Sequence, residues 1–147
     1  MRLYRGLTRP YRPPRQAGGG PLPPGTSFTD CPYTALRYAQ GGRGVLLVVD
    51  VPEGLSPGRL REELWLGVTA KRFMVWGSFD AFLVAELPAK QLRASIRGPG
   101  PAVGARADDE YRAALLKREV QRRLEALRRS APLRCLAREA ASRRTPR

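Results

Sequence analysis

Proline and glycine divide this chain into short pieces, and this constrains its fold more than any other feature. A Pro- and Gly-rich run spans residues 9–25, and further breaks fall at residues 41–44, 52–57 and 97–101. Long helices and strands do not pass through such segments, because proline lacks a backbone donor and glycine is conformationally free. The segment 1–97 therefore predicts a compact α+β domain built from short strands and short helices.

Apolar runs between these breaks predict the individual elements. The β-branched run at residues 45–51 is typical of a buried strand. Pro32 marks the first turn of a short helix. The remaining expected elements are strands at residues 2–7, 26–29, 73–76, 81–87 and 92–96, with a helical turn at residues 59–66.

The sequence changes character after a Gly/Pro linker at residues 98–107. Apolar residues then recur at helical spacing within a charged segment, at Tyr111, Leu115, Leu116, Val120, Leu124 and Leu127. This spacing predicts an amphipathic, Arg-rich helical tail over residues 108–147, interrupted at Pro132. We expect its apolar face to pack on the domain or on a partner.

The chain is strongly basic, with 27 Lys and Arg residues against 13 Asp and Glu residues and a formal net charge of +14. Such a balance favours nucleic acid, a membrane surface or phosphorylated ligands as partners. A GC-rich genome is an equally good explanation for much of the charge, because nearly every basic residue is arginine. On the tail, Arg118, Arg122 and Arg129 are the candidate contacts to nucleic-acid phosphates.

Several residue types that define common sites are missing or isolated. The chain has no histidine, which excludes His-based triads, general bases and metal sites. Cys31 and Cys135 match no metal or redox spacing and predict free thiols in a reducing compartment. The first residues lead into no apolar run, so we expect no signal segment, and the apolar run 45–49 is too short to span a bilayer. We expect a cytoplasmic protein with no transmembrane segment and no bound metal.

Three segments carry side chains suited to nucleotide chemistry. The first is Arg5 on the expected first strand, and the second is the run Thr-Ser-Phe-Thr at residues 26–29, just before the expected helix. The third is Glu86, a lone carboxylate in the apolar run 82–88. Each also has a simple structural explanation: a surface arginine, hydroxyls that fix a turn, and a carboxylate that lies at the exposed end of a strand or pairs with an arginine. Their order along the chain favours a combined role.

In this order the segments resemble the arginine–serine–glutamate type of the ADP-ribosyltransferase superfamily. The resemblance covers roughly residues 2–96 and implies a compact split β-sheet core with short helices. It implies that Arg5 binds the NAD phosphates and the adjoining ribose. It also implies that Ser27 supports the site and that Glu86 stabilises the cationic transition state, so the catalytic residues would be Glu86, Arg5 and Ser27.

The same resemblance implies an NAD site and makes NAD the substrate, with no metal required. The aromatic rings near the motifs could stack on nicotinamide or adenine, although aromatic residues more often belong to the core. The residues implied for NAD binding are Arg5, Tyr4, Gly6, Ser27, Phe28, Thr29 and Tyr38.

The residue types suit this chemistry. Cleavage of the nicotinamide–ribose bond develops positive charge on the sugar, which a carboxylate stabilises more in the transition state than in the ground state. Two phosphates require a cation, and arginine supplies a planar, permanently charged donor group. Arginine-modifying members carry Gln or Glu two residues before the catalytic Glu, where this chain has Val84. Glu62 and Glu63 are alternative carboxylates to Glu86.

The sequence thus supports functions from two classes. The first is an NAD-dependent ADP-ribosyltransferase-like enzyme that transfers ADP-ribose to a macromolecular acceptor, either nucleic acid or protein. By analogy with the family, so small a transferase would suit a bacterial toxin with a neutralising partner protein. The alternative is a non-catalytic, basic nucleic-acid-binding or assembly protein. A third, intermediate hypothesis is a degenerate transferase fold that only binds NAD or another nucleotide.

Overall fold

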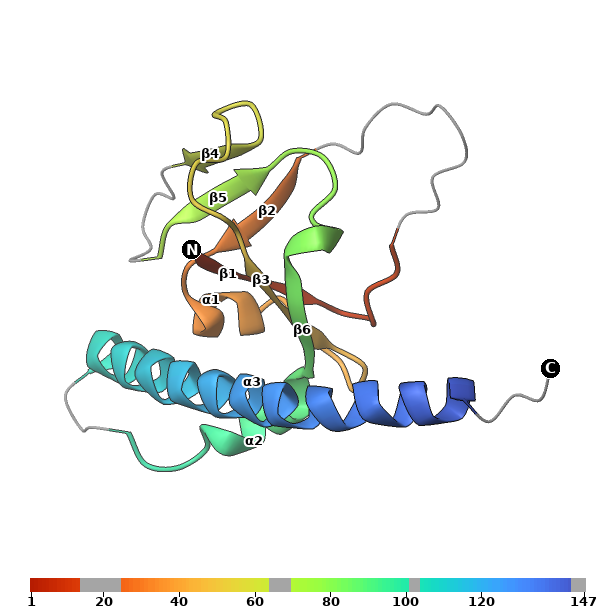
Figure 1. Ribbon diagram of the computed structural model, residues 1–147. Helices are drawn as coiled ribbons and strands as arrows, with labels where there is room; N and C mark the ends of the chain where they lie inside the picture. Colours follow the sequence, from red (N-terminus) through yellow and green to blue (C-terminus); the bar gives the residue numbers. More distant parts are fainter. Residues whose placement is uncertain (14–24, 64–69, 101–103, 144–147) are drawn as a thin grey trace.

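The computed structural model describes residues 1–13, 25–63, 70–100 and 104–143, with side chains described as far as residue 130. These residues form a small α+β protein (Figure 1). Its elements are β1 (Arg2–Leu7), β2 (Thr26–Thr29), α1 (Pro32–Leu36), β3 (Val45–Asp50), β4 (Leu60–Glu63), β5 (Arg72–Val75), the 3₁₀ turn η1 (Asp80–Phe82), β6 (Leu83–Pro88), α2 (Ala89–Ser95) and α3 (Ala105–Arg143).

The described strands form one six-stranded antiparallel sheet in the order β4-β5-β2-β1-β3-β6. β3 lies in the interior of the sheet and is buried on both faces, as its apolar sequence predicts. β1 pairs with β3 along its whole length, whereas the described residues of β1 and β2 pair at Tyr4 and Thr29 alone. The sheet therefore has two halves, β4-β5-β2 and β1-β3-β6, joined through one narrow contact.

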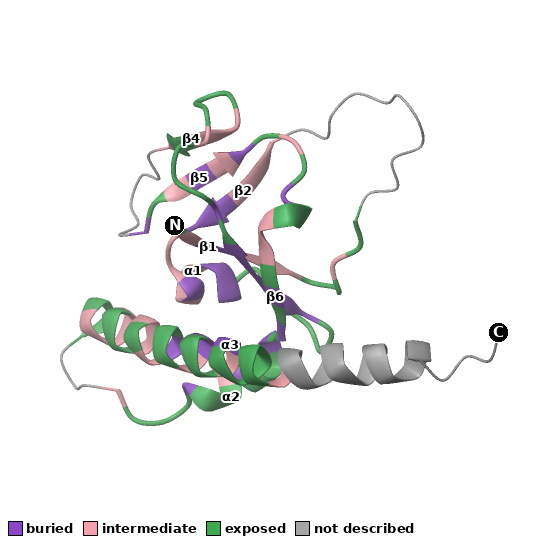
Figure 2. Cartoon of the chain, in the orientation of Figure 1, coloured by how far each residue is buried: buried purple, intermediate pink, exposed green. Residues whose placement is uncertain are grey.

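α3 packs on the sheet and shares its core. Leu116, Val120 and Leu124 of the apolar stripe are buried in one cluster with Leu46 and Val48 of β3. Figure 1 shows α3 running beneath the sheet beside α1 and α2, and Figure 2 shows its buried positions on this inner side. Of the two arrangements expected for the stripe, the helix adopts the one in which it covers its own domain.

Arginine side chains tie the helices to one another. Arg93 of α2 donates through Nη2 to the carbonyl oxygens of Leu36 and Ala39, at the end of α1. Arg112 of α3 donates through Nη1 to the carbonyl oxygen of Ile96, 2.6 Å away, at the end of α2. These oxygens lie at or just beyond the ends of the two helices, where carbonyls lose their helical partners, and the Leu36 oxygen also accepts a backbone hydrogen bond from Ala39. Part of the positive charge of the chain therefore has a structural role.

Some local predictions are wrong. The segment 59–66, expected as a helical turn, contains β4, because its backbone finds hydrogen-bonding partners on β5. The segment 92–96, expected as a strand, belongs largely to α2, where its buried residues lie one helical turn apart. α3 begins within the expected linker 98–107 and continues through Pro132, since a proline removes one backbone hydrogen bond and kinks a helix without always ending it. None of the described helices is both long and apolar enough to cross a membrane.

Candidate nucleotide-binding site

A cavity of about 330 Å³ lies between β1 and β2, beside α1. It opens where the two halves of the sheet separate, and it brings together every residue that the sequence motifs imply for NAD binding. The residues that line it are Tyr4, Arg5, Gly6, Ser27, Phe28, Thr29, Ala35, Tyr38 and Arg72. Arg72, the first residue of β5, also lines the cavity, and no sequence motif pointed to it.

Arg5 is the central charged group of this cavity. Its Nη1 donates to the backbone oxygen of Ser27, 2.8 Å away, which joins β1 to β2. The side chain is half-buried, and this burial lowers the pKa of the guanidinium below its ordinary value. Among the ion pairs of the described residues, no carboxylate partners Arg5. A desolvated cation without an acidic partner favours the binding of an anion.

Gly6 allows α1 to approach the sheet beside Arg5. A Cβ atom at this position would overlap the carbonyl oxygen of Ala35 and would lie 2.9 Å from the backbone nitrogen of Ala39. Both contacts are to backbone atoms, which cannot move aside as a flexible side chain can. The absence of a side chain at Gly6 therefore sets the distance between β1 and α1, at the place where Gly6 and Ala35 line the cavity.

The hydroxyls of the second motif have separate roles. Thr29 is buried, and its Oγ1 accepts a hydrogen bond from the backbone nitrogen of Cys31, 3.2 Å away, which fixes the turn into α1. Ser27 instead accepts a hydrogen bond through Oγ from Nε of Arg72, 3.0 Å away. Thr29 therefore fixes a turn, as the simple explanation for these hydroxyls predicts, whereas Ser27 holds the guanidinium of Arg72 in place.

A second cavity, of about 210 Å³, lies on the opposite face of the sheet. Among the described residues, Arg5 is the one that lines both cavities. Tyr11 lies in the second cavity against the ring of Phe79, with the ring centroids 5.2 Å apart. Its hydroxyl donates to Oδ1 of Asp80 at 2.6 Å; burial, together with this hydrogen bond, raises the pKa of Tyr11 to about 12. The remaining residues that line this cavity are Leu7, Thr26, Leu47, Gly77 and Ser78.

The structure does not bring Glu86 into the cavity between β1 and β2. Arg5 and Glu86 each lie opposite Leu47, on either side of β3, so the two residues share the face of the second cavity. Two strand spacings, about 10 Å, separate their backbones. Glu86 is exposed, and its Oε1 accepts a hydrogen bond from the backbone nitrogen of Tyr11, 2.9 Å away.

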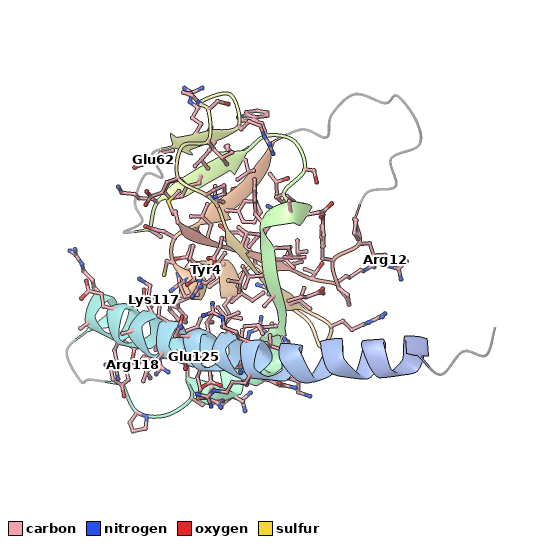
Figure 3. The ribbon with its side chains drawn as sticks, in the orientation of Figure 1. Tyr4, Arg12, Glu62, Lys117, Arg118 and Glu125 are labelled. Carbon is pink, nitrogen blue, oxygen red and sulfur yellow. The ribbon has the colours of Figure 1, made fainter. Side chains whose placement is uncertain are left out.

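The alternative carboxylates lie on β4, at the outer edge of the sheet. Glu62 forms an ion pair with Lys71, with 3.1 Å between Oε1 and Nζ, and it points outward in Figure 3. Glu63 lies 3.6 Å from Nε of Arg72, measured to Oε2. Neither lines a described cavity, but Glu63 approaches the first one through Arg72.

The arginines expected to bind nucleic acid lie on α3, outside the lining of both cavities. Arg118, Arg122 and Arg129 are all exposed, and Figure 3 shows Arg118 on the side of α3 that faces away from the sheet. Arg122 pairs with Glu119 at 2.6 Å. Hydrogen bonds from Arg122, and then from its neighbour Arg123, hold the pKa of Glu119 at about 2. Part of this basic surface is therefore already compensated within the helix.

Within the described ranges, no cluster of His, Cys, Asp and Glu residues could hold a metal ion. Cys31 is a free thiol, and Cys135 lies beyond the described side chains. The chain matches no protein-family model, no curated protein and no solved structure.

Proposed function

We propose that the protein binds a dinucleotide of the NAD type across Arg5 and acts as an ADP-ribosyltransferase-like enzyme. The observation that carries this proposal is that Arg5 lines both cavities, one on each face of the sheet, and has no acidic partner among the described ion pairs. A dinucleotide has a diphosphate at its centre and a nucleoside at each end. The diphosphate would sit at the guanidinium, with one nucleoside half in each cavity.

The arrangement of strands supports the family to which the sequence motifs point. That family has a split sheet with its site in the cleft, and here the described pairing between the two halves narrows to Tyr4 and Thr29. The arginine of the first motif and the serine of the second line the same cavity, although they are far apart in the sequence. Of the aromatic residues in this lining, Tyr38 has an exposed ring that could stack on a base, whereas Tyr4 and Phe28 are buried in the core.

The proposed reaction breaks the bond between nicotinamide and the ribose. The bonding electron pair leaves with nicotinamide, an acceptor nucleophile forms a new bond to the same sugar carbon, and the acceptor proton is released. Positive charge builds on the sugar, and a carboxylate facing it lowers the barrier. Glu86 is the proposed carboxylate, since it lies on the same face of the sheet as Arg5.

Titration and turnover with NAD test the proposal. We expect Arg5→Ala to weaken NAD binding roughly 10- to 100-fold, the cost of losing a hydrogen bond to a charged group. Arg9→Ala is the matched control, because Arg9 is exposed and lines neither cavity. Glu86→Gln should abolish nicotinamide release while leaving binding intact. Glu62→Gln and Glu63→Gln test whether either of these alternative carboxylates is needed for nicotinamide release.

Two outcomes would contradict the proposal, wholly or in part. A folded protein that does not bind NAD refutes the proposal. Binding that depends on Arg5, without nicotinamide release, would leave a nucleotide-binding protein on a degenerate transferase fold.

The alternative function is nucleic-acid binding without catalysis, and the exposed arginines of α3 favour it. Arg118 and Arg129 form no ion pair with the described acidic residues, so they can contact phosphates. Affinity that falls steeply with salt, is unaffected by NAD and decreases in the Arg118→Ala/Arg129→Ala double variant would support it. Nucleic acid is also the acceptor that we propose for the transferase, so both assays use the same RNA and DNA.

A further inference from the structure

We propose that Arg72 is a second phosphate-binding residue of the cavity between β1 and β2, and that this cavity prefers a dinucleotide with a phosphate monoester on its ribose, of the NADP type, over NAD. The inference rests on the proposed function, because it assumes that the dinucleotide lies across Arg5. It adds the class of nucleotide and a residue that selects it.

Strand register places Arg72 on the face of the sheet that carries Tyr4 and Thr29, whereas Arg5 alternates to the other face and reaches this cavity where β1 and β2 separate. Tyr4 lies opposite Thr29, and Thr29 lies opposite Arg72, so the three side chains share one face of the sheet. Two strand spacings, about 10 Å, separate the backbone of Arg72 from that of β1. Both arginines line the same cavity of about 330 Å³. The cavity thus presents two cations to a single ligand, one from β1 and one from β5.

The contacts of Arg72 hold its guanidinium in place without using all its donors. Nε donates to Oγ of Ser27 at 3.0 Å, and Nη2 lies 3.6 Å from Sδ of Met74. Oε2 of Glu63 is 3.6 Å from Nε, an ion-pair distance that is too long for a good hydrogen bond. A guanidinium carries five N–H donors, so donors on Nη1 and Nη2 remain for a ligand. The side chain is 40% exposed, so these donors are accessible.

The chemistry of the lining selects against the unphosphorylated ribose. A site for a free ribose typically uses a carboxylate to accept hydrogen bonds from its hydroxyls, whereas an arginine in that place suits a 2′-phosphate. None of the described residues that line this cavity is Asp or Glu. Beyond Arg5, which is assigned to the diphosphate, Arg72 is the remaining charged residue of the lining. A second phosphate group is the ligand chemistry that it fits.

Parallel calorimetric titrations with NADP and NAD test this inference on the full-length protein. We expect NADP to bind roughly 10- to 100-fold more tightly than NAD, as expected for one added charge-assisted contact. Arg72→Gln should abolish this preference, because it should lower the affinity for NADP far more than the affinity for NAD. Lys71→Gln is the matched control: it removes the neighbouring positive charge, which pairs with Glu62 outside the cavity, and should preserve the preference.

Each other outcome overturns the inference in a distinct way. Equal affinities of the unmodified protein for NAD and NADP would refute it without any variant, so it does not depend on whether Arg72→Gln folds. Equal weakening of both ligands by Arg72→Gln would assign Arg72 to the diphosphate instead. A preference that survives Arg72→Gln would exclude Arg72 as its source. If neither dinucleotide binds, the proposed function fails as well, whereas Arg5-dependent binding of NAD without a preference for NADP would leave that function standing.

Discussion

Leu116→Ala provides the sharpest test of the conclusion that α3 is part of the domain core. Leu116 is 0% exposed and packs in the cluster that joins α3 to the sheet. A fully buried Leu contributes roughly 1.5–3 kcal/mol by burial, and the cavity left by truncation adds to the loss. We therefore expect a loss of about 3 kcal/mol, a large share of the roughly 5–15 kcal/mol that stabilises a typical domain.

Equilibrium unfolding in urea measures this loss. With a denaturant slope of roughly 1–3 kcal/mol per molar, the midpoint should fall by about 1–3 M at an unchanged slope. Circular dichroism and tryptophan fluorescence should report the same midpoint, because α3 and the sheet share one core and should unfold together.

Leu127→Ala is the matched control, because it removes the same atoms from the same helix. Leu127 is 41% exposed, so this variant should lose less than about 1 kcal/mol. If Leu116→Ala and Leu127→Ala are equally mild, α3 does not pack on the sheet as described. Two separate transitions, one for helix and one for sheet, would also refute a shared core.

Two further perturbations have defined outcomes. Gly6→Ala should destabilise the protein by about 1–3 kcal/mol and weaken dinucleotide binding, because its Cβ would push α1 away from β1. Gly42→Ala, where the added Cβ meets no atom within 4 Å, should change neither quantity. The depressed pKa of Glu119 means that its ion pairs stabilise the fold above the ordinary Glu pKa of 4.5, and that this stability is lost as pH falls toward about 2. The melting temperature of Glu119→Gln should therefore depend less on pH between about 4.5 and 2 than that of the unmodified protein does. The same pH dependence in both proteins would count against these ion pairs.

The interior of the sheet could be predicted from the sequence, because burial and sequence pattern agree there. The apolar run that becomes β3 has no other stable environment in a chain of this size, and Pro and Gly mark the ends of its neighbours. β4 could not be recognised in the same way. Leu60–Glu63 is short and largely polar, and it is a strand because β5 supplies hydrogen-bonding partners for its backbone. Such a strand is determined by its neighbour rather than by its own composition.

The candidate site, too, could be predicted from the sequence only in part. Arg5 and Ser27 can be recognised from the sequence because each belongs to a distinct segment, and both line one cavity. Arg72 belongs to no motif, and its place beside Ser27 depends on the register between β2 and β5, which no local pattern reveals. For Glu86, exposure on a strand was the simple alternative that the sequence offered, and the side chain is indeed exposed on the edge strand β6.

The narrow contact between β1 and β2 has a mechanical consequence. Two half-sheets that share so little backbone pairing are held together mainly by side chains, through the core cluster that contains Leu3 and Phe28 and through α1, which contacts both β1 and β2. A ligand bound in the cavity between β1 and β2 would add contacts to both strands. Its binding should slow hydrogen exchange most in the amides of β1 and β2. Slower exchange there would report that the cavity is occupied, whether or not a reaction follows.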